Sequence, residues 1–449
     1  MAFTAAVEWD VRVPGDDTNG GGFAVGSGGI DFSQQNAAQV TYTDLVIDGT
    51  TNTNCTSAAF PFTSISVGNI INITGGTGFT VQRVQIISVA GGVATCDKSL
   101  GTLSSTGGQG KLGGSLASPG QGSALMVAGN TLHIKAGTYT ITSASTNVAG
   151  GCLLIPSGSI TAFTRAIGYQ NTHRDGGLRP LLQASGISTF TLCNGASSTG
   201  VMFENITVDG ASLTSSKGFG AVARALRCKA MNCTNNGFSA PATYCEATGC
   251  STGVAFTGAF FYGCVAYNNS STGIVASSVA VNCLSVNNSG SFGFSIAGGA
   301  YAFNCTAYGN GSSGFNAVGG ATLSTWTNCV STGNAGYQFG GSGAGNNVIL
   351  INCAAKADGS GTIDTANITA PTVGQITLTA DPFTNAAGGD FSLNSLSGGG
   401  AACKAAGLLG VFPGVPTVNT TGFQDIGAVQ HQGMQYLGSF QASGPTPYV

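Results

Sequence analysis

The densest group of polar side chains in the sequence lies in the segment 171–180, NTHRDGGLRP. A His, an Asp and two Arg in one loop could bind an anion or a sugar acid, because a guanidinium pairs well with carboxylate or phosphate groups. We therefore take His173, Arg174 and Arg179 as candidate binding residues and Asp175 as a candidate catalytic acid or base. The alternative is a loop that satisfies itself through Arg–Asp pairing.

Two further carboxylates could do chemistry together. Glycosidases need a pair of carboxyl groups that flank the scissile bond, and Glu204 and Asp209 lie five residues apart in the segment VMFENITVDG. They could face one groove only if the chain bends between them. Asp16 and Asp17 are adjacent, so an extended chain would point them to opposite sides, and the glycines that follow predict a turn.

The elements that must position these groups follow from a repeat. Cysteines recur every 17–24 residues in the second half of the chain, and the residue five positions after each is usually Asn. A large apolar residue follows ten or eleven positions after each cysteine. The three sets are Cys228, Cys245, Cys264, Cys283, Cys305, Cys329 and Cys353; Cys233, Cys250, Asn269, Asn288, Asn310, Asn334 and Asp358; and Phe238, Phe256, Ile274, Phe294, Phe315, Phe339 and Ile363. Repeats of this length indicate a solenoid.

The repeat predicts β coils and not helices. Segments such as 300–307, AYAFNCTA, alternate apolar and polar residues between Gly, Asn and Ser, and a sustained helical period is missing. Stacked coils about 4.8 Å apart place equivalent residues above one another. We expect Cys over Cys and Phe over Phe inside, and an asparagine ladder at a tight turn, where Asn tolerates a left-handed backbone.

The ladder cysteines are best explained as small buried apolar side chains. A zinc site would need closely spaced Cys pairs with His, but the sequence has three His, none of them near the ladder. Cys233 and Cys250 occupy the register that Asn takes in later repeats, so they could face each other, and a disulfide between them stays open. We predict no metal and no cofactor.

The composition limits the partners. Of 449 residues only 7% are charged and 42% are hydrophobic, with 73 Gly and a net charge of −3. A nearly uncharged chain lacks the basic stripe that would bind nucleic acid or an anionic membrane. No run reaches the roughly 18–20 apolar residues of a membrane helix, and the first residues, MAFTAAVEWDVRVPG, lack a signal-peptide pattern. We expect synthesis in a cytoplasm.

Several segments resemble known proteins. The segments 9–22, 132–141 and 201–210 resemble the first strands and rungs of right-handed parallel β-helix proteins of the pectate-lyase-like superfamily. Short motifs at 381–383, 390–393, 405–407 and 425–428 resemble the closing coils of the same superfamily. The resemblance implies an all-β, right-handed parallel β-helix. We divide the chain into an N-terminal strand and cap (1–40), a β insertion (41–112), the helix (113–395), and closing coils with a tail (396–449, the tail from 438).

The regular repeats contain few groups for catalysis, since Glu246 and Lys229 are the only acid and base between Arg227 and Cys353. The sequence therefore favours a non-enzymatic structural protein of a bacteriophage virion, either a capsid decoration protein or a tail spike or fibre. Such a role implies a homo-oligomer, with a trimer favoured, and contacts to other virion proteins and to surface polysaccharide. The alternatives are a tail-spike polysaccharide depolymerase and a carbohydrate-binding adhesin. A carboxylate pair roughly 5–10 Å apart in an open groove would favour the depolymerase.

Overall fold

The computed structural model describes residues 3, 6–197, 199–220, 222, 224–320, 322–369, 371–404, 406–408 and 424–429. The chain forms two compact units: residues 1–214 with 220–224, and residues 215–219 with 225–449. The predicted tail 438–449 and Ala405 of the closing-coil motif lie outside the described residues.

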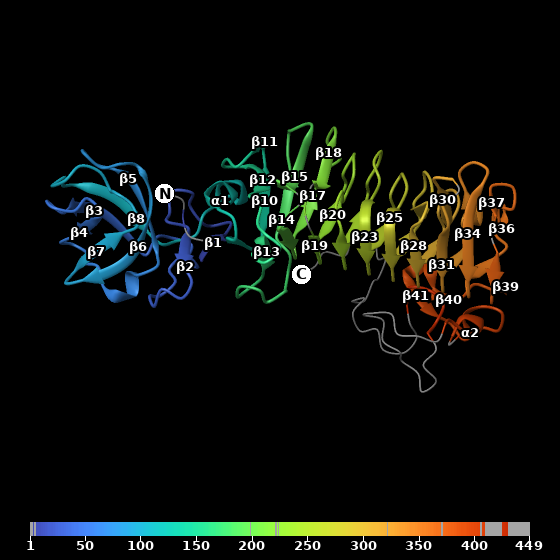
Figure 1. Cartoon of the computed structure of the whole chain (residues 1–449). Coiled ribbons are helices and arrows are strands. Elements are labelled where there is room, and N and C mark those ends of the chain that lie inside the picture. Colours follow the sequence, from blue (N-terminus) through green and yellow to red (C-terminus); the bar gives the residue numbers. More distant parts are fainter. Residues whose placement is uncertain are drawn as a thin grey trace. The chain divides into compact units, whose positions relative to one another are not determined.

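The first unit contains a closed β-barrel (Figure 1). Its strands are antiparallel and follow the order β3-β4-β7-β6-β5-β8 around the barrel. Alternating apolar residues such as Ile71 and Ile73 point into the barrel and are fully buried. The strand bounds are β3 (Val40–Ile47), β4 (Asn54–Thr56), β5 (Ile70–Gly75), β6 (Gln82–Ala90), β7 (Val93–Cys96) and β8 (Gly108–Leu112), with a 3-10 turn η1 (Ser64–Ser66).

The first unit also holds the first rungs of the parallel β-helix, where a rung is one coil of stacked strands. In one sheet β1 (Val7–Val11), β9 (Thr131–Lys135), β13 (Thr164–Tyr169) and β16 (Val201–Glu204) pair in parallel, and β2 (Gly22–Ala24) pairs antiparallel with β1. A second sheet stacks β10 (Thr138–Ile141), β14 (Leu181–Ala184) and β17 (Thr207–Asp209). A third stacks β11 (Ser143–Thr146), β12 (Gly151–Ile155) and β15 (Phe190–Gly195), next to the short helix α1 (Pro119–Leu125).

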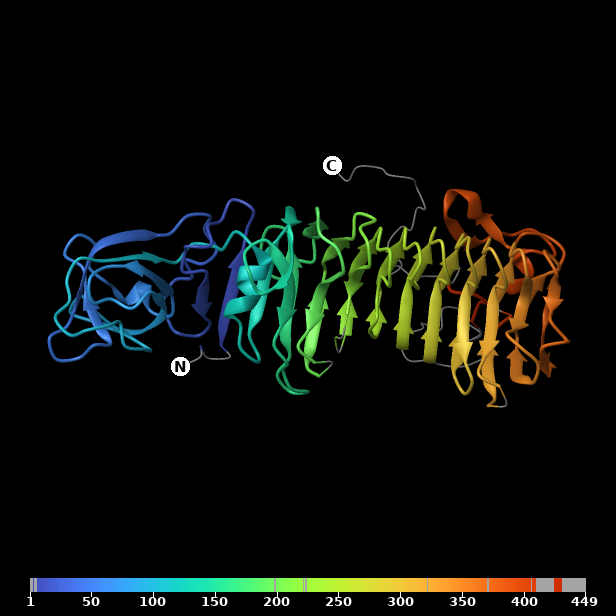
Figure 2. The ribbon, with the colours of Figure 1, turned by 90° about the horizontal axis from the view of Figure 1, so that it is seen from above.

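The second unit contains a parallel β-helix of shorter, more regular rungs (Figures 1 and 2). One sheet contains β21 (Ala242–Thr243), β23 (Phe256–Tyr262), β25 (Ile274–Val281), β27 (Phe294–Ala297), β28 (Tyr301–Phe303), β30 (Phe315–Val318), β31 (Ser324–Thr327), β33 (Tyr337–Gly341), β34 (Asn346–Ile351), β36 (Gly361–Ile363), β37 (Ile368–Thr369) and β38 (Thr372–Val373). The other contains β20 (Lys229–Met231), β22 (Glu246–Thr248), β24 (Val265–Tyr267), β26 (Leu284–Val286), β29 (Thr306–Tyr308), β32 (Val330–Thr332), β35 (Ala354–Lys356) and β39 (Ile376–Leu378). Two further strands are β18 (Ser216–Phe219) and β19 (Arg224–Leu226), and β19 pairs in parallel with β21.

The β solenoid predicted from the repeat, and the right-handed parallel β-helix that the resemblance implied, are confirmed. Each ladder cysteine is fully buried, and all fourteen cysteines are free thiols, including Cys233 and Cys250. The apolar ladder also stacks inside, with the rings of Phe294 and Phe315 4.6 Å apart and 5° from parallel. Small thiols and large apolar side chains, many of them stacked rings, fill the narrow interior of these rungs.

The asparagines form two sets with different roles. Asn269, Asn288, Asn310 and Asn334 are buried, and each of the first three donates its side-chain amide to the next over 2.8–2.9 Å. The prediction that these residues occupy the left-handed turn is wrong. The left-handed backbone falls instead on the residue before each of these asparagines and on the residue before each ladder cysteine. The former are Asn268, Asn287, Gly309 and Gly333, and the latter are Arg227, Tyr244, Gly263, Asn282, Asn304, Asn328 and Asn352, with φ of 47–70°. The side chains of the ladder asparagines point inward, because their amides form the hydrogen bonds with the buried backbone that water would otherwise form.

The C-terminal segment lies against the outer side of the stacked strands. Phe383, Phe391 and Leu393, from β40 (Phe383–Asn385) and β41 (Asp390–Leu393), pack in one cluster with Val330 and Leu378. The 3-10 turn η2 (Ala386–Gly388) and the helix α2 (Gly400–Cys403) complete this part. Among the described residues, no helix has the length and apolar character that crossing a membrane requires.

Candidate functional site

A cluster of titratable side chains lies on the outer side of the first rungs. Along β1 the side chains of Val7, Trp9 and Val11 are buried in the helix interior, so the alternating Glu8 and Asp10 point outward. On β9 the alternation places His133 outward, and Asp10 pairs with His133 in the sheet register. Strands separated by about 120 residues therefore bring two carboxylates and an imidazole together.

A loop that follows β13 adds the remaining groups, and Asp175 shapes it. The Asp175 carboxylate accepts backbone N–H bonds from Gln170, Asn171, Thr172 and Gly177 over 2.6–3.1 Å. Burial acts to raise the pKa of Asp175, but these donors outweigh it and hold the pKa well below its ordinary value. The loop is thus satisfied internally by backbone donors. The Arg–Asp pairing considered from the sequence is wrong for Arg174, which reaches another carboxylate.

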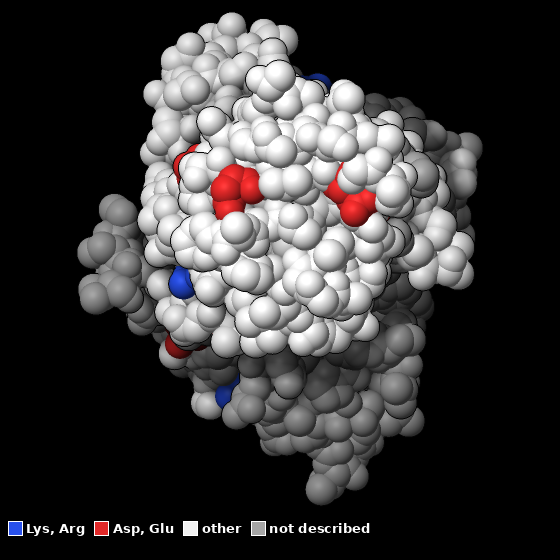
Figure 3. All heavy atoms as spheres, turned by 90° about the vertical axis from the view of Figure 1, so that its left-hand side faces the viewer, with Lys and Arg blue, Asp and Glu red and all other residues white. Residues whose placement is uncertain are grey.

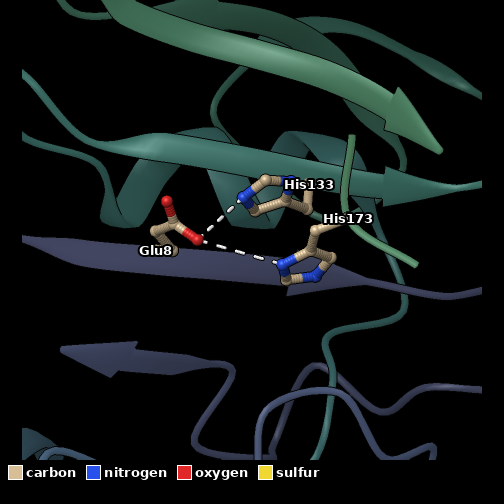
Figure 4. Close-up of side chains that lie close together, drawn as sticks. All are labelled: Glu8, His133 and His173. Atoms are coloured by element: carbon tan, nitrogen blue, oxygen red, sulfur yellow. Dashed lines mark hydrogen bonds and ion pairs between the residues drawn. The ribbon is translucent and has the colours of Figure 1, made fainter. Parts of the chain in front are cut away.

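His173 stands at the centre of the cluster (Figure 4). Its Nε2 lies 2.7 Å from Asp10 Oδ2 and its Nδ1 lies 3.8 Å from Glu8 Oε2. Its ring stacks on the ring of His133, with centroids 3.6 Å apart and planes 3° from parallel. Glu8 also contacts His133 Nε2 at 3.0 Å through Oε2 and Arg174 at 3.0 Å through Oε1. The loop is therefore fastened to β1 through both carboxylates.

Asp10 is fully buried and its two oxygens have several partners. Arg12 Nε lies 2.8 Å from Oδ1, and the Tyr169 hydroxyl donates to Oδ2 over 2.7 Å, beside the His173 contact. Burial, followed by the charge of Asp10, raises the pKa of Tyr169 well above its ordinary value, so this phenol stays protonated as the donor. The buried carboxylate is compensated by a guanidinium and by hydrogen bonds, as buried charges require.

Protonation at Glu8 and His133 is governed by opposing effects. Burial acts to raise the pKa of Glu8, but the hydrogen bond from His133 and the charges of His133, Arg174 and His173 lower it overall. Burial lowers the pKa of His133, and the contact with Glu8 only partly opposes this. His133 Nδ1 is buried without a hydrogen-bond partner among the described residues. Near neutral pH the cluster thus contains an ionised Glu8 and a neutral His133.

Glu8, His133 and His173 each offer a metal-ligand atom, and these atoms lie within 4.8 Å of one another. Two imidazoles that share a tetrahedral metal must direct their in-plane lone pairs to one point. Parallel rings stacked 3.6 Å apart direct their lone pairs side by side. Binding a metal would therefore require the stack to open and His173 to leave Asp10. In the conformation described, the cluster holds the loop against β1.

The other predicted residues are distributed around this cluster. Ile167 on β13 pairs with His133 on one neighbouring strand and with Glu204 on the other, so His133 and Glu204 lie two strands apart in the same sheet. Asp209 lies on β17 in the next sheet, where it accepts hydrogen bonds from Gln183 and the Ala211 N–H. A left-handed Asn205, with φ of 55°, makes the bend between the two acids. The predicted pair is thus split between two sheets.

Of the predicted binding residues, the structure brings His173 and Arg174 into the cluster, and Arg179 lies at the end of the same loop. The Thr18 N–H donates to the Asp16 carboxylate and the Asn19 N–H donates to the Asp16 carbonyl, which confirms the predicted turn. Asp16 also pairs with Lys111, and Asp17 accepts the N–H groups of Ala117 and Ser118.

Sequence reasoning missed Glu8, Asp10 and His133. A signal was present, because the run VEWDVR alternates apolar and charged residues and so places Glu8, Asp10 and Arg12 on one side of a strand.

Comparison with known proteins gives structural neighbours only. No family model and no curated protein matches the chain. Solved structures that match include the mannuronan C-5 epimerase A-module of Azotobacter vinelandii (15% identity, 56% of this chain and 89% of that chain, TM-score 0.38). They also include pectate lyase Pel9A (15%, 72% and 92%, 0.33) and ORF18 of Geobacillus virus E2 (12%, 55% and 52%, 0.32). The chain aligns with about half the length of the viral protein. Likeness at this level carries no argument about activity.

Proposed function

We propose that the chain is a non-enzymatic structural protein of a bacteriophage particle, a capsid decoration protein or a tail spike or fibre, that acts through its shape and surface contacts. The observation that carries the proposal is that the carboxylates of Glu8 and Asp10 are engaged in contacts within their own unit. All four of their carboxylate oxygens contact His, Arg or Tyr side chains of the same unit. These groups serve to fasten a loop to a rigid stack of strands.

The second unit supports the same role. Its interior consists of stacked thiols, aromatic rings and hydrogen-bonded amides, and Lys229 and Glu246 on β20 and β22 lie 3.4 Å apart as a pair. A stack of this kind is stiff and presents a mostly uncharged exterior. In the first unit, the face on the barrel side is also white over most of its area, with acidic side chains in few places (Figure 3). Such surfaces associate through shape and apolar contact, and the strength of this association depends little on the salt concentration.

The experiment is antibody-gold electron microscopy on particles from the source culture. Label over the whole shell would support a decoration protein and would exclude the enzyme. Label confined to the tail would support a spike or fibre and would call for a polysaccharide-cleavage assay. Particles without label would overturn the proposal.

A second candidate function is a polysaccharide depolymerase that uses the Glu8 cluster. It is favoured by one observation: the Glu8 side chain is 24% exposed and the Arg174 side chain is 56% exposed, so an acid and a cation meet at the edge of the buried histidines. An acidic polysaccharide could place a carboxylate on Arg174. The test is release of reducing ends or of unsaturated ends from anionic polysaccharides. Activity that Glu8→Gln abolishes and Glu246→Gln leaves unchanged would establish it.

A further inference from the structure

A pair of cysteines takes the place of asparagines in the inner ladder of the second unit. Cys233 and Cys250 occupy the register that Asn269 and the later ladder asparagines occupy. Both cysteines are fully buried, and the Asn269 amide oxygen accepts the Cys250 N–H over 2.9 Å. The ladder of neutral amides therefore begins next to two thiols. Amides can only exchange hydrogen bonds, whereas two thiols can also form a covalent bond.

The two cysteines lie on neighbouring rungs in register. β20 pairs with β22, with Lys229 opposite Glu246, and Cys233 and Cys250 follow with the same spacing along the chain. The Ser251 N–H donates to the Cys233 carbonyl over 3.0 Å, so the register continues past the ends of the strands. Neighbouring strands lie about 4.8 Å apart, and the Cα atoms of bonded cysteines are usually about 4.4–6.8 Å apart. The backbone therefore holds the two residues at a separation that a disulfide accepts.

The surroundings of Cys250 favour its thiolate. The Cys233 thiol donates a hydrogen bond to the Cys250 sulfur, and the N–H groups of Cys233 and Gly237 donate to it as well. The bond from the thiol has the largest effect, and together these donors lower the pKa of Cys250 against the effect of burial. Cys228 and Cys245 join the same two rungs, but there burial has the largest effect and raises the pKa of Cys245. Because the thiolate is the reactive form, the two pairs should differ in reactivity although they connect the same rungs.

We propose that Cys233 and Cys250 form a disulfide when the protein meets hydrogen peroxide, which fastens the rung of β20 to the rung of β22. The Cys250 thiolate attacks one peroxide oxygen, the O–O bond breaks, and the other oxygen leaves as hydroxide, which the proton lost from Cys250 converts to water. The Cys233 sulfur then attacks the sulfenic acid at Cys250, the S–O bond breaks, and a second water leaves with the Cys233 proton. Two thiols and one peroxide thus give one disulfide and two waters. The bond closes the loop 233–250 and restricts the unfolded chain, and the inference does not depend on the proposed function.

The test treats the native full-length chain with hydrogen peroxide, alkylates the remaining thiols in denaturant and maps the peptides by mass spectrometry. All but two of the 14 cysteines should be alkylated, with a disulfide between residues 233 and 250. The melting temperature should rise by roughly 3–10 °C on oxidation and return on reduction with dithiothreitol. The variant Cys233→Ala should lose this rise. The matched control Cys228→Ala, in the same two rungs, should keep it.

Each variant is compared with its own reduced form, so the stability that a substitution itself costs does not enter the comparison. The proposal fails if the wild-type protein keeps all 14 thiols, or if Cys233→Ala retains the rise in melting temperature. It also fails if the disulfide forms in the long cysteine column instead, for example between Cys264 and Cys283. Sulfinic acid at Cys250 without a disulfide would mean that Cys233 does not reach the oxidised sulfur, which overturns the proposal as well. The particle assay reports location and not thiol chemistry, so it can succeed while this proposal fails.

Discussion

The strands β1, β9 and β13 of the first unit and the strands β25, β28 and β31 of the second unit pair in the same parallel, in-register manner. Their outward side chains differ. The first group presents Glu8, Asp10 and His133, and the second presents Val279, Tyr301 and Thr325. The backbone arrangement is therefore compatible with opposite surface chemistries.

The difference shows how each region remains folded. In the first rungs, charge on the outer side fastens a loop that the strands alone would not hold. In the later rungs, stability comes from the interior, where apolar rings and neutral amides repeat at each level. The first region should respond to charge removal and to pH, and the second to changes in packing. The predictions below test this contrast, from the largest expected effect to the smallest.

The largest effect should come from the interior stack of the second unit. Phe315 lies between Phe294 and Phe339, with ring centroids 4.6 Å and 5.5 Å away, and it also contacts Trp326. We expect Phe315→Ala to lower the free energy of unfolding by about 3–5 kcal/mol, because it leaves a cavity in a close-packed core. Urea denaturation would measure this. The control Phe260→Ala, on the exposed side, should cost less than about 1 kcal/mol, and equal losses would contradict the assignment of inside and outside.

The next effect should come from the buried charge of the first unit. Asp10→Asn keeps the shape of the side chain but leaves the buried Arg12 without a counter-charge, so we expect a loss of about 2–3 kcal/mol in that unit. The matched control is Asp16→Asn, which removes a surface pair with Lys111 in which the Asp16 side chain is 50% exposed, and it should cost less than about 1 kcal/mol. Hydrogen exchange of residues 170–178 should rise only in the Asp10 variant. Unchanged exchange there would show that the carboxylate does not hold the loop.

A smaller effect should come from the amide ladder. Asn310 accepts from Asn288 and donates to Asn334. Asn310→Ala should cost about 1–2 kcal/mol, because it leaves buried donors and acceptors without a partner. The loss should be the same at low and high salt, since no charge is involved. A loss that depends on salt would contradict the neutral character of the second unit.

The sequence predicted the second unit better than the first for a physical reason. The Cys, Asn and Phe ladders repeat locally, so the fold, the buried thiols and the stacked rings could be read from spacing. The Glu8 cluster depends on pairing between β1 and β9, which are separated by the barrel β3–β8 and by more than a hundred residues. Single occurrences such as Glu8 and His133 have no period that reveals their partners. Only the alternation around Trp9 marked the outward side of β1.

The smallest effect, and the one most specific to the first unit, should appear on acidification. The folded-state pKa of His133 lies below its ordinary value of 6.5, and that of Glu8 lies below its ordinary value of 4.5. In both cases the unfolded state binds more protons between the two pKa values, so stability falls as pH falls. The loss should begin below pH 6.5 through His133 and increase below pH 4.5 through Glu8. Hydrogen exchange of residues 170–178 should therefore increase between pH 7 and pH 5, while the amides of β25, β28 and β31 keep their protection after correction for the intrinsic pH dependence of exchange.

The variant His133→Gln should remove the part of the change above pH 4.5. Loop protection that stays constant over this range would mean that the histidine stack does not contribute to holding the loop, and the contrast between the two units would then rest on Asp10 alone.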